Sequence, residues 1–163
     1  MPEALIGLGG NVGDVRVTLD RAVAAFCDGA AVRLVARSAD YETPPWGVTD
    51  QPAFVNLCLK VATDLAPRDL LKRALAVEAS LGRDRASGQR WGPRPVDIDI
   101  LAYDEMVLDE PDLHLPHPRM ADRAFVLVPL AEIAPDWIVG GISVADRAAR
   151  MDAAGVTRLL DRS

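Results

Sequence analysis

The sequence predicts an α+β fold in which helices pack against an antiparallel sheet. Segments with strand-like alternation and segments with helical spacing follow in the order strand, helix, strand, strand, helix, strand up to residue 101. That βαββαβ order is typical of the ferredoxin-like arrangement. More helical segments come after it. We expect these extra C-terminal helices to cover the second face of the sheet and to give three layers, αβα.

The first part of the chain supplies a strand, a helix and a second strand. Residues 3–9 indicate a strand, and the glycine-rich stretch 9–13 indicates a turn. This stretch lacks the G-x-G-x-x-G spacing of a dinucleotide site. Asp14 is a candidate N-cap for a helix over residues 15–27, whose apolar residues recur at helical spacing. Residues 32 to about 41 alternate and predict the second strand.

The middle of the chain supplies a loop, a strand and a second helix. Residues 42–52 contain three prolines and Trp46, so we expect a loop. Residues 54–63 predict a third strand, with Phe54 and Asn56 on the face opposite its core residues. Pro67 suits the first turn of a helix over residues 67–81. Its expected buried stripe is Leu70, Leu71, Ala74, Leu75 and Leu81.

After residue 101 the pattern is less regular. We expect a turn at residues 103–106, a short strand near Val107 and a proline-bounded loop over 111–119. A helix is expected within residues 119–133. Ser143 with Asp146 resembles a capping box for a last helix that ends near Gly155.

Composition narrows the class of protein. We expect one domain over residues 1–163, because this length is enough for a substantial core. The net charge of -6 argues against broad attraction to nucleic acid. Cys27 and Cys58 form no C-x-x-C motif, and the sequence shows neither a secretory leader nor a membrane span. A cytoplasmic monomer acting on small molecules is expected.

The stretch from Gln89 to Leu101 carries the chemistry. Residues 96–101 predict a strand in which Asp97 and Asp99 share one face while Val96, Ile98 and Ile100 point into the core. Two adjacent carboxylates repel each other unless positive charge lies between them. Mg²⁺ supplies such charge and is commonly held by one or two carboxylates plus substrate phosphates.

An arginine-rich loop precedes the two aspartates. It carries Arg83, Arg85, Arg90 and Arg94, with Trp91 among them. Guanidinium groups bind phosphate oxygens in a bidentate manner. Metal-binding carboxylates behind such a loop are what a site for a nucleoside triphosphate needs.

Other interpretations of these residues remain open. Asp97 and Asp99 could lie on a solvent face and pair with the arginines. His114 and His117 form H-x-x-H, a weak zinc pattern without a third soft ligand nearby. A two-metal nucleotidyltransferase or nuclease would use Asp97, Asp99 and Asp104. A non-catalytic ferredoxin-like domain that binds a nucleotide would need no Mg²⁺-dependent turnover.

Several segments match those of a known family, and the R-W-G-P-R-x-x-D-x-D segment over residues 90–99 is the most specific match. The other matching segments are Gly7-Leu8-Gly9-Gly10-Asn11, Thr43-Pro44-Pro45, Asp50-Gln51-Pro52, Phe54-Val55-Asn56, Gly82-Arg83, Leu115-Pro116-His117-Pro118-Arg119-Met120 and Arg123-Ala124-Phe125. They appear in the family's order from residue 5 to about residue 135. In these segments the chain resembles the 6-hydroxymethyl-7,8-dihydropterin pyrophosphokinases of folate biosynthesis.

The resemblance implies the reaction and a set of site residues. The family transfers the pyrophosphoryl group of ATP to the pterin hydroxymethyl oxygen, and AMP leaves. Asp97 and Asp99 are similar to the pair that binds two Mg²⁺ ions, and Arg83 and Arg94 to the arginines that hold the transferring phosphates. The implied ATP contacts are Arg83, Arg85, Trp91, Arg94, Ile100, His117 and Arg123. The implied pterin contacts are Thr43, Pro44, Trp46, Phe54, Asn56, Trp91 and Phe125.

The chain departs from the family pattern at a few positions. Phe54 stands where many members have tyrosine, and Gly10 stands where serine is usual. Leu75, Asp112 and Pro118 differ from the types near the adenosine in other members. The resemblance therefore implies least about the residues that contact the adenosine.

Overall fold

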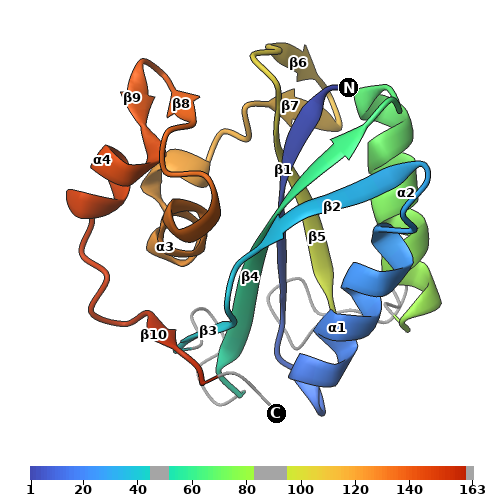
Figure 1. Cartoon of the computed structure of the whole chain (residues 1–163). Helices are drawn as coiled ribbons and strands as arrows, with labels where there is room; N and C mark the ends of the chain where they lie inside the picture. The colour runs from blue at the N-terminus through green and yellow to red at the C-terminus, as the bar shows by residue number, and fades with distance from the viewer. Residues whose placement is uncertain (45–51, 83–94, 161–163) are drawn as a thin grey trace.

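The computed structural model describes residues 1–44, 52–82 and 95–160. A six-stranded antiparallel sheet forms its middle layer (Figure 1). Strand β1 (Glu3–Gly10) lies inside this sheet, between β4 (Phe54–Thr63) and β5 (Asp97–Tyr103). On its other side β4 pairs with β2 (Val32–Arg37) and with β3 (Tyr41–Thr43).

Two helices complete the core motif. Helix α1 (Val15–Phe26) follows β1, and helix α2 (Pro67–Ser80) follows β4 and precedes β5. The chain order is therefore βαββαβ once β2 and β3 are counted as one interrupted strand. The predicted ferredoxin-like core is confirmed.

The remaining elements follow β5. They are β6 (Leu108–Glu110), β7 (Leu113–Leu115), a 3₁₀ turn (Met120–Asp122), α3 (Ala124–Ile133), β8 (Ile138–Val139), β9 (Ile142–Ser143), α4 (Val144–Ala149) and β10 (Thr157–Arg158). Strand β10 pairs with β3 and adds a last strand to the sheet. No helix among the described residues is long and apolar enough to cross a membrane.

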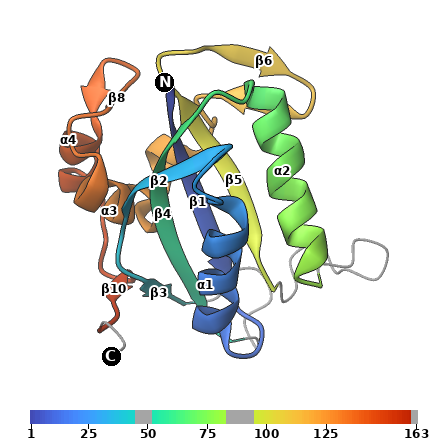
Figure 2. The same ribbon diagram turned by 45° about the vertical axis from the view of Figure 1, so that its right-hand side comes forward.

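Each face of the sheet has its own core. One core joins α1 and α2 to alternate residues of the strands, including Ile6, Leu57 and Ile98. The second core joins α3 and α4 to Leu5 and Cys58, which belong to the opposite face. Figures 1 and 2 show α1 and α2 on one side of the sheet and α3 and α4 on the other. The three layers were expected from the order of the segments.

Three helix starts follow the expected capping chemistry. Asp14 accepts a hydrogen bond from the backbone N–H of Val17 at 3.4 Å. Pro67 is the first residue of α2. Ser143 accepts from the N–H of Asp146 at 3.1 Å and begins α4.

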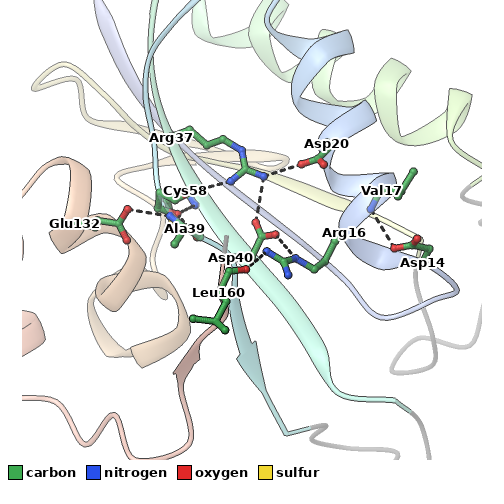
Figure 3. A network of polar contacts seen from close by, with 11 residues as sticks. Asp14, Arg16, Val17, Asp20, Arg37, Ala39, Asp40, Cys58, Glu132 and Leu160 are labelled. Atoms are coloured by element: carbon green, nitrogen blue, oxygen red, sulfur yellow. Dashed lines mark hydrogen bonds and ion pairs between the residues drawn. The ribbon is translucent and has the colours of Figure 1, made fainter. Parts of the chain in front are cut away.

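The predicted second strand is interrupted at Ser38–Asp40, so β2 and β3 are separate elements. Figure 3 shows the polar contacts around this break. Asp40 is only 4% exposed and accepts hydrogen bonds from Arg16 at 2.8 Å and from Arg37 at 3.1 Å. The N–H of Ala39 donates to Glu132 at 2.9 Å. Side chains from remote elements thus provide hydrogen bonds to the backbone and to the Asp40 carboxylate where the strand is interrupted.

Three details of the sequence predictions differ from the structure. Leu75 is 38% exposed and lies outside the buried stripe, where Val77 and Glu78 are buried instead. The short strand expected near Val107 is present as β6, which starts at Leu108, but its partner β7 lies inside the expected proline-bounded loop. Helix α4 ends at Ala149, well before Gly155.

Candidate active site

The face of the sheet that carries α3 has two glycines at its centre. In the register, Gly9 of β1 lies between Asn56 of β4 and Asp97 of β5. Gly7 lies in the next row between Cys58 and Asp99. Neighbouring strands are about 4.8 Å apart, so the backbones of Asn56 and Asp97 are about 10 Å apart across a floor without side chains.

Only glycine fits at position 9, because the Asn56 side chain lies against it. A Cβ atom at this position would lie 2.2 Å from Oδ1 of Asn56, which is far inside a van der Waals contact. A Cβ on Gly7 would meet Leu101 at 3.4 Å, an ordinary distance. The missing side chain at Gly9 therefore lets the Asn56 amide lie over β1.

Asn56 is held from the other side by β3. Its Nδ2 donates to Oγ1 of Thr43 at 3.4 Å, and Thr43 is buried. Phe54 is paired with Thr43 in the register and is half-buried. Pro44 is exposed and follows directly after β3. Thr43, Phe54 and Asn56 thus form one edge of the glycine floor, as alternation predicted for Phe54 and Asn56.

Asp97 and Asp99 form the opposite edge. They project from the same face of β5, with Asp97 half-buried and Asp99 exposed. Val96, Ile98 and Ile100 are buried in the core shared with α1 and α2, so the predicted division of this strand is confirmed. The side chain of Ile100 faces away from the aspartates. Only its backbone is available for the expected contact with ATP.

A β-bulge brings His117 to this edge. The register of β1 with β5 shifts between Leu5 and Ile6, which leaves Leu101 as an extra residue. The carbonyl of Leu101 accepts the backbone N–H of His117 at 2.7 Å. Sequence reasoning missed this bulge, because no local residue pattern marks it.

The His117 ring is oriented by its neighbour. Its Nδ1 accepts from the backbone N–H of Arg119 at 3.1 Å, so the proton of the neutral ring lies on Nε2. Burial lowers the pKa of His117, Asp99 opposes this effect, and Arg123 and Arg119 add to it. His117 is therefore neutral at pH 7 and presents an N–H donor.

Arg123 and Phe125 lie at the start of α3. The guanidinium carbon of Arg123 stands 5.6 Å from the centre of the Phe125 ring, within the range of a cation–π interaction. Phe125 packs against the core of the α3 face. One residue of the predicted ATP set thus contacts one residue of the predicted pterin set.

Five predicted site residues lie outside the described residues: Trp46, Arg83, Arg85, Trp91 and Arg94. Their placement stays a prediction.

Two alternatives lose support from the geometry. Asp104 accepts the N–H of Glu3 at 2.8 Å in the turn after β5. It is five residues beyond Asp99, or about 16 Å along a strand, so the carboxylate triad of a nuclease is not assembled. His114 pairs with Asp109 at 2.8 Å, whereas His117 contacts Arg119. The H-x-x-H pair thus has two separate sets of partners.

Asp97 and Asp99 are the candidate metal ligands. Among residues 1–44, 52–82 and 95–160, no group of three or more His, Cys, Asp or Glu side chains is gathered to hold an ion. Mg²⁺ is commonly bound by only one or two protein carboxylates when substrate phosphates complete its coordination shell. Two carboxylates on one strand face match that number. Asp97 and Asp99 fit that mode of binding and do not fit a closed protein site.

Comparisons with known proteins show the family of this chain. The family model of 7,8-dihydro-6-hydroxymethylpterin-pyrophosphokinase matches residues 5–135. The protein named 2-amino-4-hydroxy-6-hydroxymethyldihydropteridine pyrophosphokinase from Methylorubrum extorquens is 48% identical over 159 residues, 98% of this chain and 99% of that relative. Its namesake from Pseudomonas aeruginosa is 47% identical over 131 residues, 80% of each chain.

A solved structure supports the fold. The crystal structure of Plasmodium falciparum HPPK-DHPS with SDX-DHP has a TM-score of 0.68 at 14% identity. The match covers 97% of this chain and 47% of that longer chain. At this identity the likeness concerns the fold alone, whereas the family model and the relatives show the family. The chain belongs to the 7,8-dihydro-6-hydroxymethylpterin-pyrophosphokinase family.

Proposed function

We propose that the glycine floor and its two edges carry out the family's reaction by direct in-line displacement, assisted by two Mg²⁺ ions. The reaction transfers pyrophosphate from ATP to the hydroxymethyl group of 6-hydroxymethyl-7,8-dihydropterin in folate biosynthesis. The hydroxymethyl oxygen attacks the β-phosphorus of ATP and loses its proton. The bond from that phosphorus to the oxygen of AMP breaks. No protein nucleophile is needed, so positioning and charge neutralisation supply the catalysis.

The observation that carries the proposal is the row Asn56–Gly9–Asp97. It provides an amide at one edge of a bare floor and a carboxylate at the other, about 10 Å apart across two strand spacings. A flat ring with hydrogen-bonding edges needs placed polar groups and apolar faces. The phosphates, next to the ring, need positive charge, which a metal ion bound by carboxylates can supply. Across the sheet, the row places an amide for the ring edge at one side and a carboxylate for the metal at the other.

The pterin side of the floor would be formed by Asn56, Thr43, Pro44 and Phe54. In this proposal Asn56 hydrogen-bonds the ring edge and Phe54 contributes an apolar surface. Phe125, Trp46 and Trp91 would be further pterin contacts.

The phosphate side would be formed around Asp97 and Asp99, which hold the metal. Mg²⁺ at these carboxylates would neutralise phosphate charge. His117 would donate Nε2–H to a phosphate oxygen, and Arg123 would add a guanidinium. Arg83 and Arg94 would hold the transferring group, with Arg85, Trp91 and the backbone of Ile100 as further ATP contacts.

The experiment is a product analysis. The protein is incubated with ATP, Mg²⁺ and the hydroxymethyl-dihydropterin, and the nucleotide and pterin products are separated. The proposal predicts AMP and a pterin pyrophosphate in equal amounts, with none formed when Mg²⁺ is chelated. Release of inorganic pyrophosphate would indicate a nucleotidyltransferase, and tight ATP binding without turnover would indicate a binding domain.

We further propose that residues 1–163 act as one domain and as a monomer in the cytoplasm, with small molecules as the only substrates. The two cores share one sheet, which supports the single domain. Size-exclusion chromatography with light scattering tests the monomer, and cell fractionation tests the location.

A further inference from the structure

A buried carboxylate lies behind the two aspartates. Glu78 is on α2 and only 3% exposed. Burying a carboxylate is costly unless hydrogen bonds satisfy its oxygens. A glutamate near the end of a surface helix ordinarily points to solvent, so this position requires a specific partner.

One partner is the backbone between the two candidate metal ligands. Oε2 of Glu78 accepts the N–H of Ile98 at 2.7 Å. Ile98 lies opposite Leu8 of β1 in the register, and its N–H is directed away from β1 toward the outer edge of β5. No other strand pairs with that edge among the described residues. One side chain therefore takes the place of a ladder bond at this point.

The hydrogen bond has a consequence for both carboxylates. The N–H of Ile98 belongs to the peptide unit that joins Asp97 to Ile98, and peptide units are planar. Fixing this unit restrains ψ of Asp97 and φ of Ile98, the residue that links the two aspartates. The direction of the Asp97 side chain relative to that of Asp99 depends on those torsions.

We propose that Glu78 is a positioning residue that sets the separation and direction of Asp97 and Asp99 for the metal. The inference rests on the proposed function, because it concerns the same two carboxylates. Partners that orient metal-binding side chains commonly change metal affinity by about 10- to 100-fold when they are removed. A purely stabilising role for Glu78 would leave metal affinity unchanged in the folded enzyme.

Three substitutions separate the length, the charge and the volume of the Glu78 side chain. Glu78→Gln keeps an acceptor oxygen at the same reach and loses the charge. Glu78→Asp keeps the charge, but its chain is one methylene shorter and does not reach Ile98. Glu78→Leu removes both the acceptor and the charge at similar volume.

Glu132 offers a matched control on the other face. It is a helix carboxylate on α3 that accepts a backbone N–H, that of Ala39, at 2.9 Å. The segment that it holds carries no metal ligand. Glu132→Gln and Glu132→Leu therefore report what loss of such a contact does to the fold alone.

The measurements are urea unfolding, the Mg²⁺ concentration for half-maximal turnover, and Mn²⁺ binding by electron paramagnetic resonance with a non-hydrolysable ATP analogue. We expect Glu78→Asp and Glu78→Leu to weaken Mn²⁺ binding and to raise the Mg²⁺ requirement by about tenfold or more. Glu78→Gln should stay within about threefold of the wild type. The Glu132 variants should lose stability and keep the metal dependence of the wild type.

Two outcomes would overturn the inference. If Glu78→Asp binds Mn²⁺ as the wild type does, the contact with Ile98 does not position the carboxylates. If Glu78→Gln is as impaired as Glu78→Asp, a neutral acceptor at the same reach is not enough, and positioning by this hydrogen bond alone is refuted. Failure of the proposed function would appear separately, as absence of pterin pyrophosphate in the wild type, and the Mn²⁺ comparison would still decide the role of Glu78.

Discussion

Around residues 7–9 and 97–100 the two faces of β1 and β5 have opposite compositions. On the face toward α1 and α2, Leu8, Ile98 and Ile100 are each no more than 4% exposed. On the other face the same strands carry Gly7, Gly9 and the two aspartates. The packed face determines where the backbone lies, and the bare face uses that backbone as a floor. Chemistry placed on strands whose other side is well packed is held more precisely than chemistry placed on loops.

The largest expected effect comes from the face that carries the two aspartates. Asp97→Asn and Asp99→Ala should each lower turnover by about 10³-fold, because the charge that holds the metal is lost. Their free energies of unfolding should stay close to that of the wild type, since removing one carboxylate also relieves repulsion. AMP formation and urea unfolding measure the two quantities. Near-normal Mg²⁺-dependent rates in either variant would refute the metal assignment.

The packed face should give the reverse pattern. Ile98→Ala removes a buried side chain from between the two aspartates and should lower the free energy of unfolding by about 2–5 kcal/mol. The backbone and both carboxylates stay, so the fraction that remains folded at low temperature should bind the ATP analogue within about tenfold of the wild type. Urea unfolding and titration at 10 °C, a temperature chosen to keep the variant folded, check both parts. A larger loss of ATP affinity than of stability would mean that the two faces are not independent.

The two glycines allow a finer test within the bare face. Gly9→Ala forces Asn56 to move, because the new Cβ would lie 2.2 Å from its Oδ1. We expect pterin affinity to fall by about tenfold, or about 1.4 kcal/mol. Gly7→Ala meets Leu101 at an ordinary 3.4 Å and should change pterin affinity much less. Calorimetric titration of the pterin with an ATP analogue present measures both, and equal effects would refute the role of Asn56.

The smallest expected effect is a pH dependence from His117. Its pKa in the folded protein is lowered from 6.5, chiefly by burial. Above pH 6.5 the ring is neutral in both states. As the pH falls below 6.5 the unfolded chain takes up the proton first, so stability decreases until the lower folded pKa is reached.

Urea unfolding between pH 7.5 and pH 5 should therefore show a small loss of stability that His117→Asn lacks. His114→Asn serves as the control, because His114 is the only other histidine in the sequence. If His117→Asn loses as much stability as the wild type over this range, the titrating group lies elsewhere.

The sequence alone predicted what depends on local periodicity. The shared face of Asp97 and Asp99 follows from the two-residue repeat of a strand, and so does the separation of Asn56 from the core residues of β4. The helix starts at Asp14, Pro67 and Ser143 follow from capping chemistry that acts within one turn. In each case the residues that decide the outcome are neighbours in the sequence.

What the sequence did not predict depends on remote partners. The break between β2 and β3 is satisfied by Arg16 and Glu132, which come from α1 and α3. At the bulge, the carbonyl of Leu101 accepts the backbone N–H of His117, which follows β7 in the chain. Glu78 looks like one more polar residue on a helix until β5 is packed beside it. No short window of sequence contains both members of these pairs.

The row Asn56–Gly9–Asp97 also constrains the order in which the protein can assemble. During synthesis β1 can pair with β4 once Thr63 has been made, but its other neighbour arrives only with residues 97–103. Until then the edge of β1 that will face Asp97 is open, and pairing across such long sequence separations is slow. A partly folded chain therefore has the amide edge of the floor without its carboxylate edge. Ligands that need both edges would bind only after the last core strand is in place, and they would then stabilise the complete fold.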